Sequence, residues 1–196
     1  MSCLVSISDD AINPYLPDKY FTLNGNKAKL VKYLSEKLRN AGVDVIECLE
    51  DADCMIVKSA LLSAQTNQGP TAVVVDDTDV IVMLMHHWND NMDDVVVVQQ
   101  NSRRSWSIKT NKPSVNEFEP YLLFLHAWSG CDTTSSTFGE GKSHVFKTFR
   151  KFPLVKTLAD TITDEKSNQD EVGDASEKMF KLTYGCSIDQ TLTSIR

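Results

Sequence analysis

The sequence has few cysteines, and none of them forms the paired spacing typical of small metal sites. Its five cysteines include no Cys-x-x-Cys pair, and their number is odd. This pattern argues against a structural zinc site and against a disulfide framework. We therefore expect reduced thiols, as in the cytosol or nucleus.

Long apolar runs are also missing. No stretch approaches the roughly 20 apolar residues that a membrane helix needs. The first ten residues, MSCLVSISDD, contain no basic segment and meet acidic residues early, unlike a secretory signal. The sequence thus predicts an intracellular protein, nuclear or cytoplasmic and not secreted, with no membrane partner. Its 196 residues, 41% hydrophobic, can bury the core of one compact domain.

Positive charge is scarce overall but concentrated in one segment. The net charge is −7, which by itself argues against a nonspecific nucleic-acid binder. Residues 101–156, however, hold nine basic and four acidic residues, so this segment carries +5 and the remainder −12. The segment is either a nucleic-acid-binding surface or simply a solvated face.

Apolar periodicity predicts helices alternating with short β-branched strands. We expect helices at 27–42, 50–64, 80–88, 115–128 and 154–162, with a strand as the alternative at 80–88. We expect strands at 43–46, 73–75 and 95–100, and an edge strand or hairpin arm within 102–114. Two short helical pieces should flank a Gly-x-Gly-Lys turn, followed by an acidic loop at 163–173 and a helix or strand at 175–184. This order is typical of an α/β fold in which helices cover both faces of a mostly parallel sheet. We assign 1–23 to an irregular lead-in, 24–159 to the main domain with a helical hairpin at 130–156, and 160–196 to the acidic loop and a short C-terminal element.

Acidic residues occur where ligand sites of α/β folds are expected. The segment TAVVVDDTDVIVMLMHHW (71–88) places an acidic cluster directly after a buried strand. Further acids open the helix at 50–64 and follow the helix at 115–128. The candidate metal ligands are Asp51, Asp53, Asp77, Asp79 and Asp132. Converging carboxylates hold divalent cations, and two Mg²⁺ or Mn²⁺ ions could together cleave a phosphodiester. The alternative is that these acids are helix caps and solvated loop residues.

Three motifs in order, EDAD, VVVDDTD and LLFLHAWSGCDTTSSTFGEGKSHVFKTF, resemble the flap endonuclease branch of the PIN-like nucleases. They resemble still more closely a group of animal PIN-like proteins, associated with mobile elements, that read EDAD, DDTD and HAFTGCDTTS. The resemblance covers about residues 23–196. It implies a PIN-like three-layer α/β/α fold with a helix-hairpin-helix module, and a structure-specific nuclease acting on branched or single-stranded DNA.

The resemblance also implies roles for individual residues. The five candidate ligands would hold two Mg²⁺ or Mn²⁺ ions, with Glu50 and Asp76 supporting them. The hairpin, with a bound cation such as K⁺, would grip DNA phosphates. The residues implied in DNA binding are Gly139, Gly141, Lys142, Lys147, Arg150 and Lys151.

One departure from the family concerns the amino-terminal end. Flap-type nucleases carry two further metal-binding aspartates on segments before the acidic helix, and Asp9, Asp10 and Asp18 lack that context. We therefore expect an incomplete amino-terminal part, and a degenerate domain that binds nucleic acid or protein without cleavage is an alternative. A second alternative is a haloacid dehalogenase-type phosphatase, because VVVDDTDV resembles the first motif of that family.

Histidine and cysteine residues near the acids have simpler interpretations. His126 lies among leucine and alanine and reads as a hydrogen-bonded core residue. Cys131 precedes Asp132, but the sequence shows no histidine partner that would make it a nucleophile. His86 and His87 follow an apolar run and read as packing or capping residues at the end of a helix.

Overall fold

The computed structural model describes residues 25–48, 51–66 and 68–190. The chain divides into two compact units, Met1–Asp51 and Ala52–Arg196. The predicted lead-in at 1–23 and Glu50 lie outside the described residues.

The described residues of the first unit form helix α2 (Asn26–Asn40), which confirms the predicted helix. Its apolar stripe remains open to solvent, since Val31, Leu34 and Leu38 are each exposed. The strand predicted at 43–46 is wrong, because these residues form no strand. An apolar run becomes a strand only when a neighbouring strand satisfies its backbone groups, and no strand among the described residues pairs with residues 43–46.

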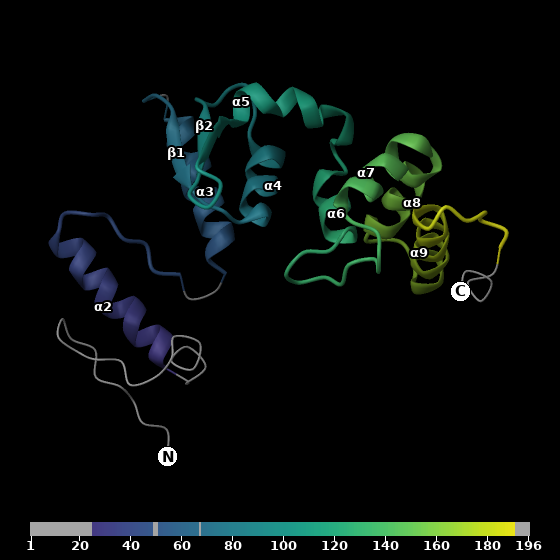
Figure 1. Ribbon diagram of the computed structural model, residues 1–196, viewed down its shortest axis with the longest axis horizontal. Helices are drawn as coiled ribbons and strands as arrows, with labels where there is room; N and C mark the ends of the chain where they lie inside the picture. Colours follow the sequence, from purple (N-terminus) through teal and green to yellow (C-terminus); the bar gives the residue numbers. More distant parts are fainter. Residues whose placement is uncertain (1–24, 49–50, 67, 191–196) are drawn as a thin grey trace, which may run out of the picture. The chain divides into compact units, whose positions relative to one another are not determined.

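The second unit contains a three-stranded sheet (Figure 1). Its strands are β1 (Thr71–Val74), β2 (Val95–Gln99) and β3 (Arg104–Ser107). β1 and β2 are parallel, with Val73 opposite Val97, whereas β2 and β3 are antiparallel, with Val97 opposite Trp106. The mixed α/β class is confirmed, as are the strands predicted at 73–75, at 95–100 and within 102–114.

The sheet is covered on one face. Val73 and Val97 are buried, whereas Val74, whose side chain points to the opposite face, is 59% exposed. Because side chains alternate between the two faces of a strand, this pattern leaves one face open among the described residues. Helices on both faces, and with them a PIN-like three-layer arrangement, are therefore not confirmed in the part of the chain that the structure describes.

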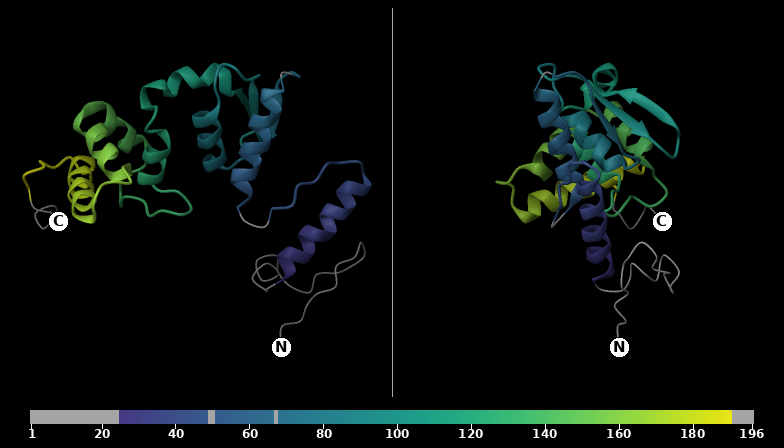
Figure 2. Two further views of the ribbon diagram at one scale, coloured as in Figure 1. Left: turned by 180° about the vertical axis from the view of Figure 1, so that it is seen from behind. Right: turned by 90° about the vertical axis from the view of Figure 1, so that its left-hand side faces the viewer.

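Helices α3 (Ala52–Gln65) and α4 (Thr78–His87) pack against each other, and α3 contacts β1 and β2 (Figure 2). Ala64, Val80 and Leu84 are fully buried between these elements. Asp93 joins their ends, since its backbone N–H donates to the Ala64 carbonyl at 2.8 Å and its own carbonyl accepts from Trp88 Nε1 at 2.9 Å. Both helices were predicted, and α4 carries the acidic cluster at its first turn.

The helix predicted over 115–128 is interrupted. The chain forms α5 (Ile108–Asn111), the 3₁₀-helix η1 (Lys112–Phe118) and then α6 (Leu122–Trp128). Pro120 lacks an N–H and disfavours helical backbone at the residue before it, so the helix cannot run through this point. The interruption lets α6 pack against α4, which brings two distant parts of the sequence together.

Three helices complete the unit: α7 (Lys142–Lys151), α8 (Leu154–Thr163) and α9 (Gln169–Thr183). Residues 131–138 contain no helix, so the helical piece predicted before the Gly-x-Gly-Lys turn is wrong and only the piece after it forms. The predicted division between 159 and 160 falls inside α8.

The acidic loop is shorter than predicted, because α9 begins at Gln169 with an Asn168–Glu171 capping box. In such a box the cap and the third residue satisfy each other's backbone N–H groups. α8 and α9 then pack through Val155, Leu158 and Met179. None of the helices in the described residues is long and apolar enough to cross a membrane.

Candidate functional site

A polar cavity of about 330 Å³ opens between the start of α4, the loop after α6 and the start of α7. Three of the five predicted metal ligands, Asp77, Asp79 and Asp132, line this cavity. Its remaining lining residues are Thr78, Gly130, Cys131, Thr134, Ser136 and Lys142. Three carboxylates and one ammonium give the lining a formal charge of −2, which favours a cation.

The local fold of residues 76–79 places the acidic cluster. The Asp77 side chain is the N-cap of α4, and its Oδ1 accepts the backbone N–H of Asp79 at 2.8 Å. An N-cap uses one carboxylate oxygen and leaves the second for a ligand. Asp76 instead accepts the backbone N–H of Asn101 at 3.1 Å, which ties the end of β1 to the β2–β3 turn. Asp76 thus has a structural contact outside the cavity.

The loop after α6 is held by short-range hydrogen bonds. The Thr134 hydroxyl donates to the Ala127 carbonyl at 2.6 Å and accepts the backbone N–H of Cys131 at 3.1 Å. Gly130 has a φ of 97°, and a Cβ at this position would lie 2.6 Å from Cβ of Ser136. These contacts fold the loop tightly against the end of α6 and so fix the positions of Cys131 and Asp132.

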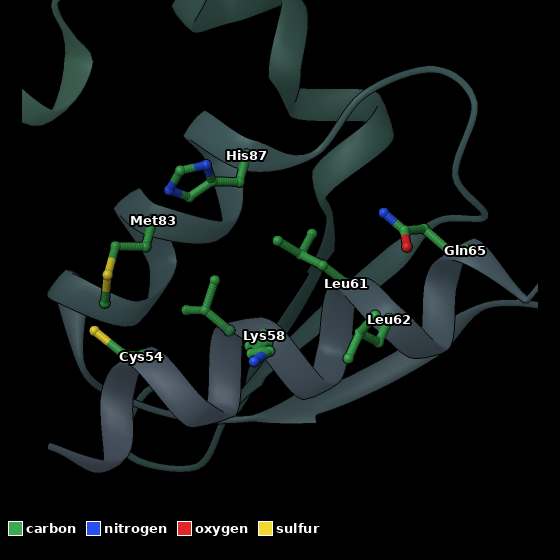
Figure 3. A pocket seen from close by; sticks show the side chains of 8 residues that line it. Cys54, Lys58, Leu61, Leu62, Gln65, Met83 and His87 are labelled. Atoms are coloured by element: carbon green, nitrogen blue, oxygen red, sulfur yellow. The ribbon is translucent and has the colours of Figure 1, made fainter. Parts of the chain in front are cut away.

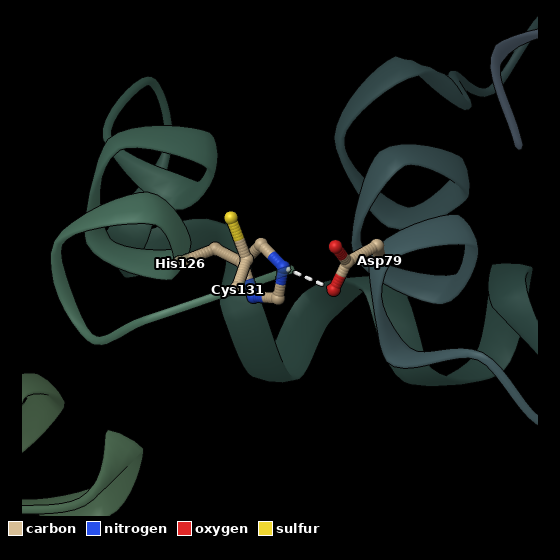
Figure 4. Close-up of side chains that lie close together, drawn as sticks. All are labelled: Asp79, His126 and Cys131. Carbon is tan, nitrogen blue, oxygen red and sulfur yellow. Dashed lines mark hydrogen bonds and ion pairs between the residues drawn. The ribbon is translucent and has the colours of Figure 1, made fainter. Parts of the chain in front are cut away.

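His126, from the last turn of α6, connects the two sides of the site (Figure 4). Its side chain is buried, and its Nε2 lies 2.9 Å from Oδ1 of Asp79. On the other side of the ring, Nδ1 lies 3.3 Å from Nζ of Lys142. The imidazole therefore bridges an acid at the start of α4 and a lysine at the start of α7.

The two neighbours determine which nitrogen of His126 carries the ring hydrogen. An ammonium group can only donate, so Nδ1 accepts from Lys142. A carboxylate only accepts, so Nε2 carries hydrogen and donates to Asp79. A continuous series of hydrogen bonds consequently runs from Lys142 through the buried His126 ring to Asp79.

Cys131 lies beside this series of hydrogen bonds. Its Sγ lies 3.3 Å from the hydroxyl oxygens of both Thr133 and Thr134. Hydrogen bonding from Thr133, followed by Thr134, lowers the pKa of the Cys131 thiol. Because the single Thr134 hydroxyl hydrogen is already given to Ala127, we attribute the lowered pKa to Thr133.

The remaining predicted ligands are placed differently. Asp53 lies in the first turn of α3 and is not among the residues that line the cavity. Asp51 belongs to the first unit and Glu50 lies outside the described residues. The structure therefore brings together the second and third acidic motifs.

The residues predicted to bind DNA lie at the start of α7 and along it. Gly139 has a φ of 78° in the turn before the helix, and Gly141 is the N-cap of α7. Arg150 is paired with Glu117, which raises the pKa of Arg150 and lowers the pKa of Glu117 through their shared hydrogen bond. Lys147 is exposed, and Nζ of Lys151 lies over the Phe152 ring.

A second cavity of about 330 Å³ lies between α3 and α4 (Figure 3). It is largely apolar, with Val57, Leu61 and Met83 in its wall, and none of the predicted acidic ligands lines it. His87 lines this second cavity. At the same end of α4, burial lowers the pKa of His86. Neither histidine joins the acidic site.

Sequence analysis did not identify His126 and Cys131 as parts of one site. Within the described residues, ligand atoms of Asp79, His126 and Cys131 all lie within 4.8 Å of one another. The spacing of five positions between His126 and Cys131 was visible in the sequence, but the sharp turn at Gly130 that reverses the chain was not.

Comparison with known proteins gives no relative: no family model, curated protein or solved structure matches this chain.

Proposed function

We propose that the second unit is a divalent-metal-dependent nuclease-like domain that hydrolyses DNA phosphodiesters at the cavity between α4, α6 and α7. The observation that carries this proposal is that Asp77, Asp79 and Asp132, up to 55 positions apart, line one solvent-open cavity. Such a set of hard oxygen donors suits Mg²⁺ or Mn²⁺.

The chemistry would be divided between metal and protein. A bound Mg²⁺ or Mn²⁺ supplies Lewis acidity and an activated water for phosphodiester hydrolysis. The three carboxylates would hold the cation, with Asp132 reaching from the loop side and Asp77 using the oxygen that it does not need as a cap. Lys142, at the cavity edge, would attract the phosphate, because phosphate contacts dominate nucleic-acid affinity.

Two further features support a nucleic-acid substrate. Lys147, Arg150 and Lys151 follow Lys142 on the same helix. Phe138, in the turn before α7, has a side chain that is 92% exposed, while its backbone carbonyl is held by the Tyr184 hydroxyl at 3.1 Å. An exposed aromatic ring beside a basic helix is the combination that binds single strands through stacking and phosphate contacts.

The test compares wild type with Asp132→Asn in a Mn²⁺-dependent cleavage assay on flapped, forked and single-stranded DNA. Asp132 is exposed, so the variant should fold normally. We expect cleavage to fall by at least about 100-fold, since even residues outside the ligand shell typically cost 10- to 100-fold. Asp90→Asn, an exposed acid in the turn after α4, is the matched control and should cleave like wild type.

Other results would favour other functions. Equal cleavage by wild type and Asp132→Asn would contradict the proposal. DNA binding that depends on Lys142, with no cleavage under any metal, would indicate a degenerate binding domain. Hydrolysis of a small phosphomonoester instead of DNA would favour the phosphatase alternative.

A further inference from the structure

We propose that Asp79, His126 and Cys131 form a binding site for a thiophilic transition metal of the Zn²⁺ class. This goes beyond the proposed nuclease function, because two of the three donors, His126 and Cys131, play no part in that function. The site uses one carboxylate oxygen, one imidazole nitrogen and one sulfur.

The distances between the donor atoms fit such an ion after a small adjustment. All three lie within 4.8 Å of one another, and Asp79 Oδ1 and His126 Nε2 are 2.9 Å apart. Tetrahedral zinc, with bonds of about 2.0 Å to nitrogen or oxygen and 2.3 Å to sulfur, needs ligand atoms about 3.3–3.6 Å apart. Movements of about an ångström, within reach of side-chain rotation, therefore produce the coordination geometry.

The chemistry of the donors selects the metal. Sulfur is a soft ligand that Mg²⁺ avoids, whereas a thiolate, an imidazole and a carboxylate are the three ligand types that zinc uses. Three protein ligands would leave a fourth position open. Asp79 and Cys131 both line the solvent-open cavity, so this position would face the cavity.

The scaffold holds the donors close before any metal binds. His126 is buried, and the backbone of Cys131 is tied to α6 through Thr134 and Ala127. Asp79 is fixed in the first turn of α4 by the Asp77 cap. Little conformational entropy is therefore lost on binding, which favours affinity.

Lys142 competes with the metal. Metal coordination through Nε2 of His126 requires the ring hydrogen on Nδ1, yet Nδ1 now accepts from the Lys142 ammonium at 3.3 Å. Two donors cannot face each other at that distance, so metal binding must break this contact and move the lysine. The Lys142 charge would also repel the ion. Removing the ammonium should consequently tighten metal binding, which is the opposite of its expected effect on DNA binding.

The experiment titrates the whole chain with Co²⁺ and, in competition with a chromophoric chelator, with Zn²⁺. Wild type should show the intense near-ultraviolet charge-transfer absorption of a cobalt–thiolate bond. Cys131→Ser should lose this absorption and bind Zn²⁺ on the order of 100-fold more weakly. Cys54→Ser, an exposed cysteine on α3, is the matched control and should match wild type. Lys142→Met should bind Zn²⁺ several-fold more tightly.

Several results would overturn the site. Cobalt binding without the thiolate absorption, or equal Zn²⁺ affinity in Cys131→Ser and Cys54→Ser, would exclude Cys131 as a ligand. Weaker Zn²⁺ binding by Lys142→Met would contradict the proposed competition between Lys142 and the metal ion. His126→Gln tests the third donor, with circular dichroism to confirm folding, and unchanged affinity in a folded variant would also count against the site. Because the readout is metal binding without DNA, absence of nuclease activity would leave this inference intact.

Discussion

Nε2 of His126 lies 2.9 Å from Oδ1 of Asp79, although the two residues are 47 positions apart. The hydrogen bond joins the last turn of α6 to the first turn of α4, and it is partly buried at the wall of the polar cavity. It positions the acidic cluster relative to the loop that carries Cys131 and Asp132. The candidate site therefore depends on the packing of α4 against α6.

Replacing Asp79 should reveal the strength of this link. Asp79→Ala leaves a buried ring N–H unpaired, which should lower the free energy of unfolding by about 1–3 kcal/mol. Asp79→Asn retains Oδ1 as an acceptor and should lower the free energy of unfolding by less than half as much. Urea unfolding of both variants measures the difference, and equal losses would show that the hydrogen bond contributes little.

Gly130 should tolerate substitution less well than Gly139. Both have positive φ, so alanine at either position costs about 1–2 kcal/mol of backbone strain. At Gly130 the new Cβ would also collide with Ser136, whereas at Gly139 it would meet nothing within 4 Å. Overpacking adds about 1–3 kcal/mol. The midpoint temperature of thermal unfolding should therefore be clearly lower for Gly130→Ala than for Gly139→Ala. Gly130→Ala should also weaken Zn²⁺ binding.

The reactivity of Cys131 should persist to lower pH than that of an ordinary thiol. Hydrogen bonding from Thr133 lowers the pKa of this thiol in the folded state. The corresponding stabilisation is fully present above the unfolded-state pKa and is lost as pH falls through the lowered pKa. Because the thiolate is the nucleophile, alkylation by iodoacetamide without metal should follow the lowered pKa.

Two variants at position 133 test this cause. Thr133→Val removes the hydroxyl and should shift the alkylation midpoint of Cys131 to higher pH. Thr133→Ser keeps the hydroxyl and should leave the midpoint near that of wild type. An identical pH profile for Thr133→Val and wild type would rule out Thr133 as the cause.

Phe138 should matter for DNA binding and hardly at all for folding. Its side chain is 92% exposed, so Phe138→Ala should change the free energy of unfolding by no more than about 0.5 kcal/mol. Loss of base stacking should weaken single-strand binding by about 1–3 kcal/mol. Fluorescence anisotropy with a labelled oligonucleotide measures this effect. Leu62→Ala, at another exposed apolar position, is the control and should bind normally.

The elements whose signals are local could be predicted from the sequence. The helical periodicity of α2, α3 and α4 and the valine runs of β1 and β2 all follow from neighbouring residues. Pro120 shows the limit of this reasoning, because the apolar pattern at 115–128 continued across a residue that helical backbone does not tolerate. The strand expected at 43–46 failed for a different reason, since a strand depends on a partner that periodicity cannot supply.

The composition of the site depends on contacts between distant parts of the chain. The sequence identified Asp77, Asp79, Asp132 and Lys142 as candidates, and the structure places all four around one cavity. It also adds His126 and Cys131, because helix packing brings α6 onto α4 and the turn at Gly130 returns the chain to the same place. Sequence patterns report which side chains share one helix or strand. The contact between Asp79 and His126, which are 47 positions apart, arises from the burial of apolar surface across the whole unit, and no local pattern encodes it.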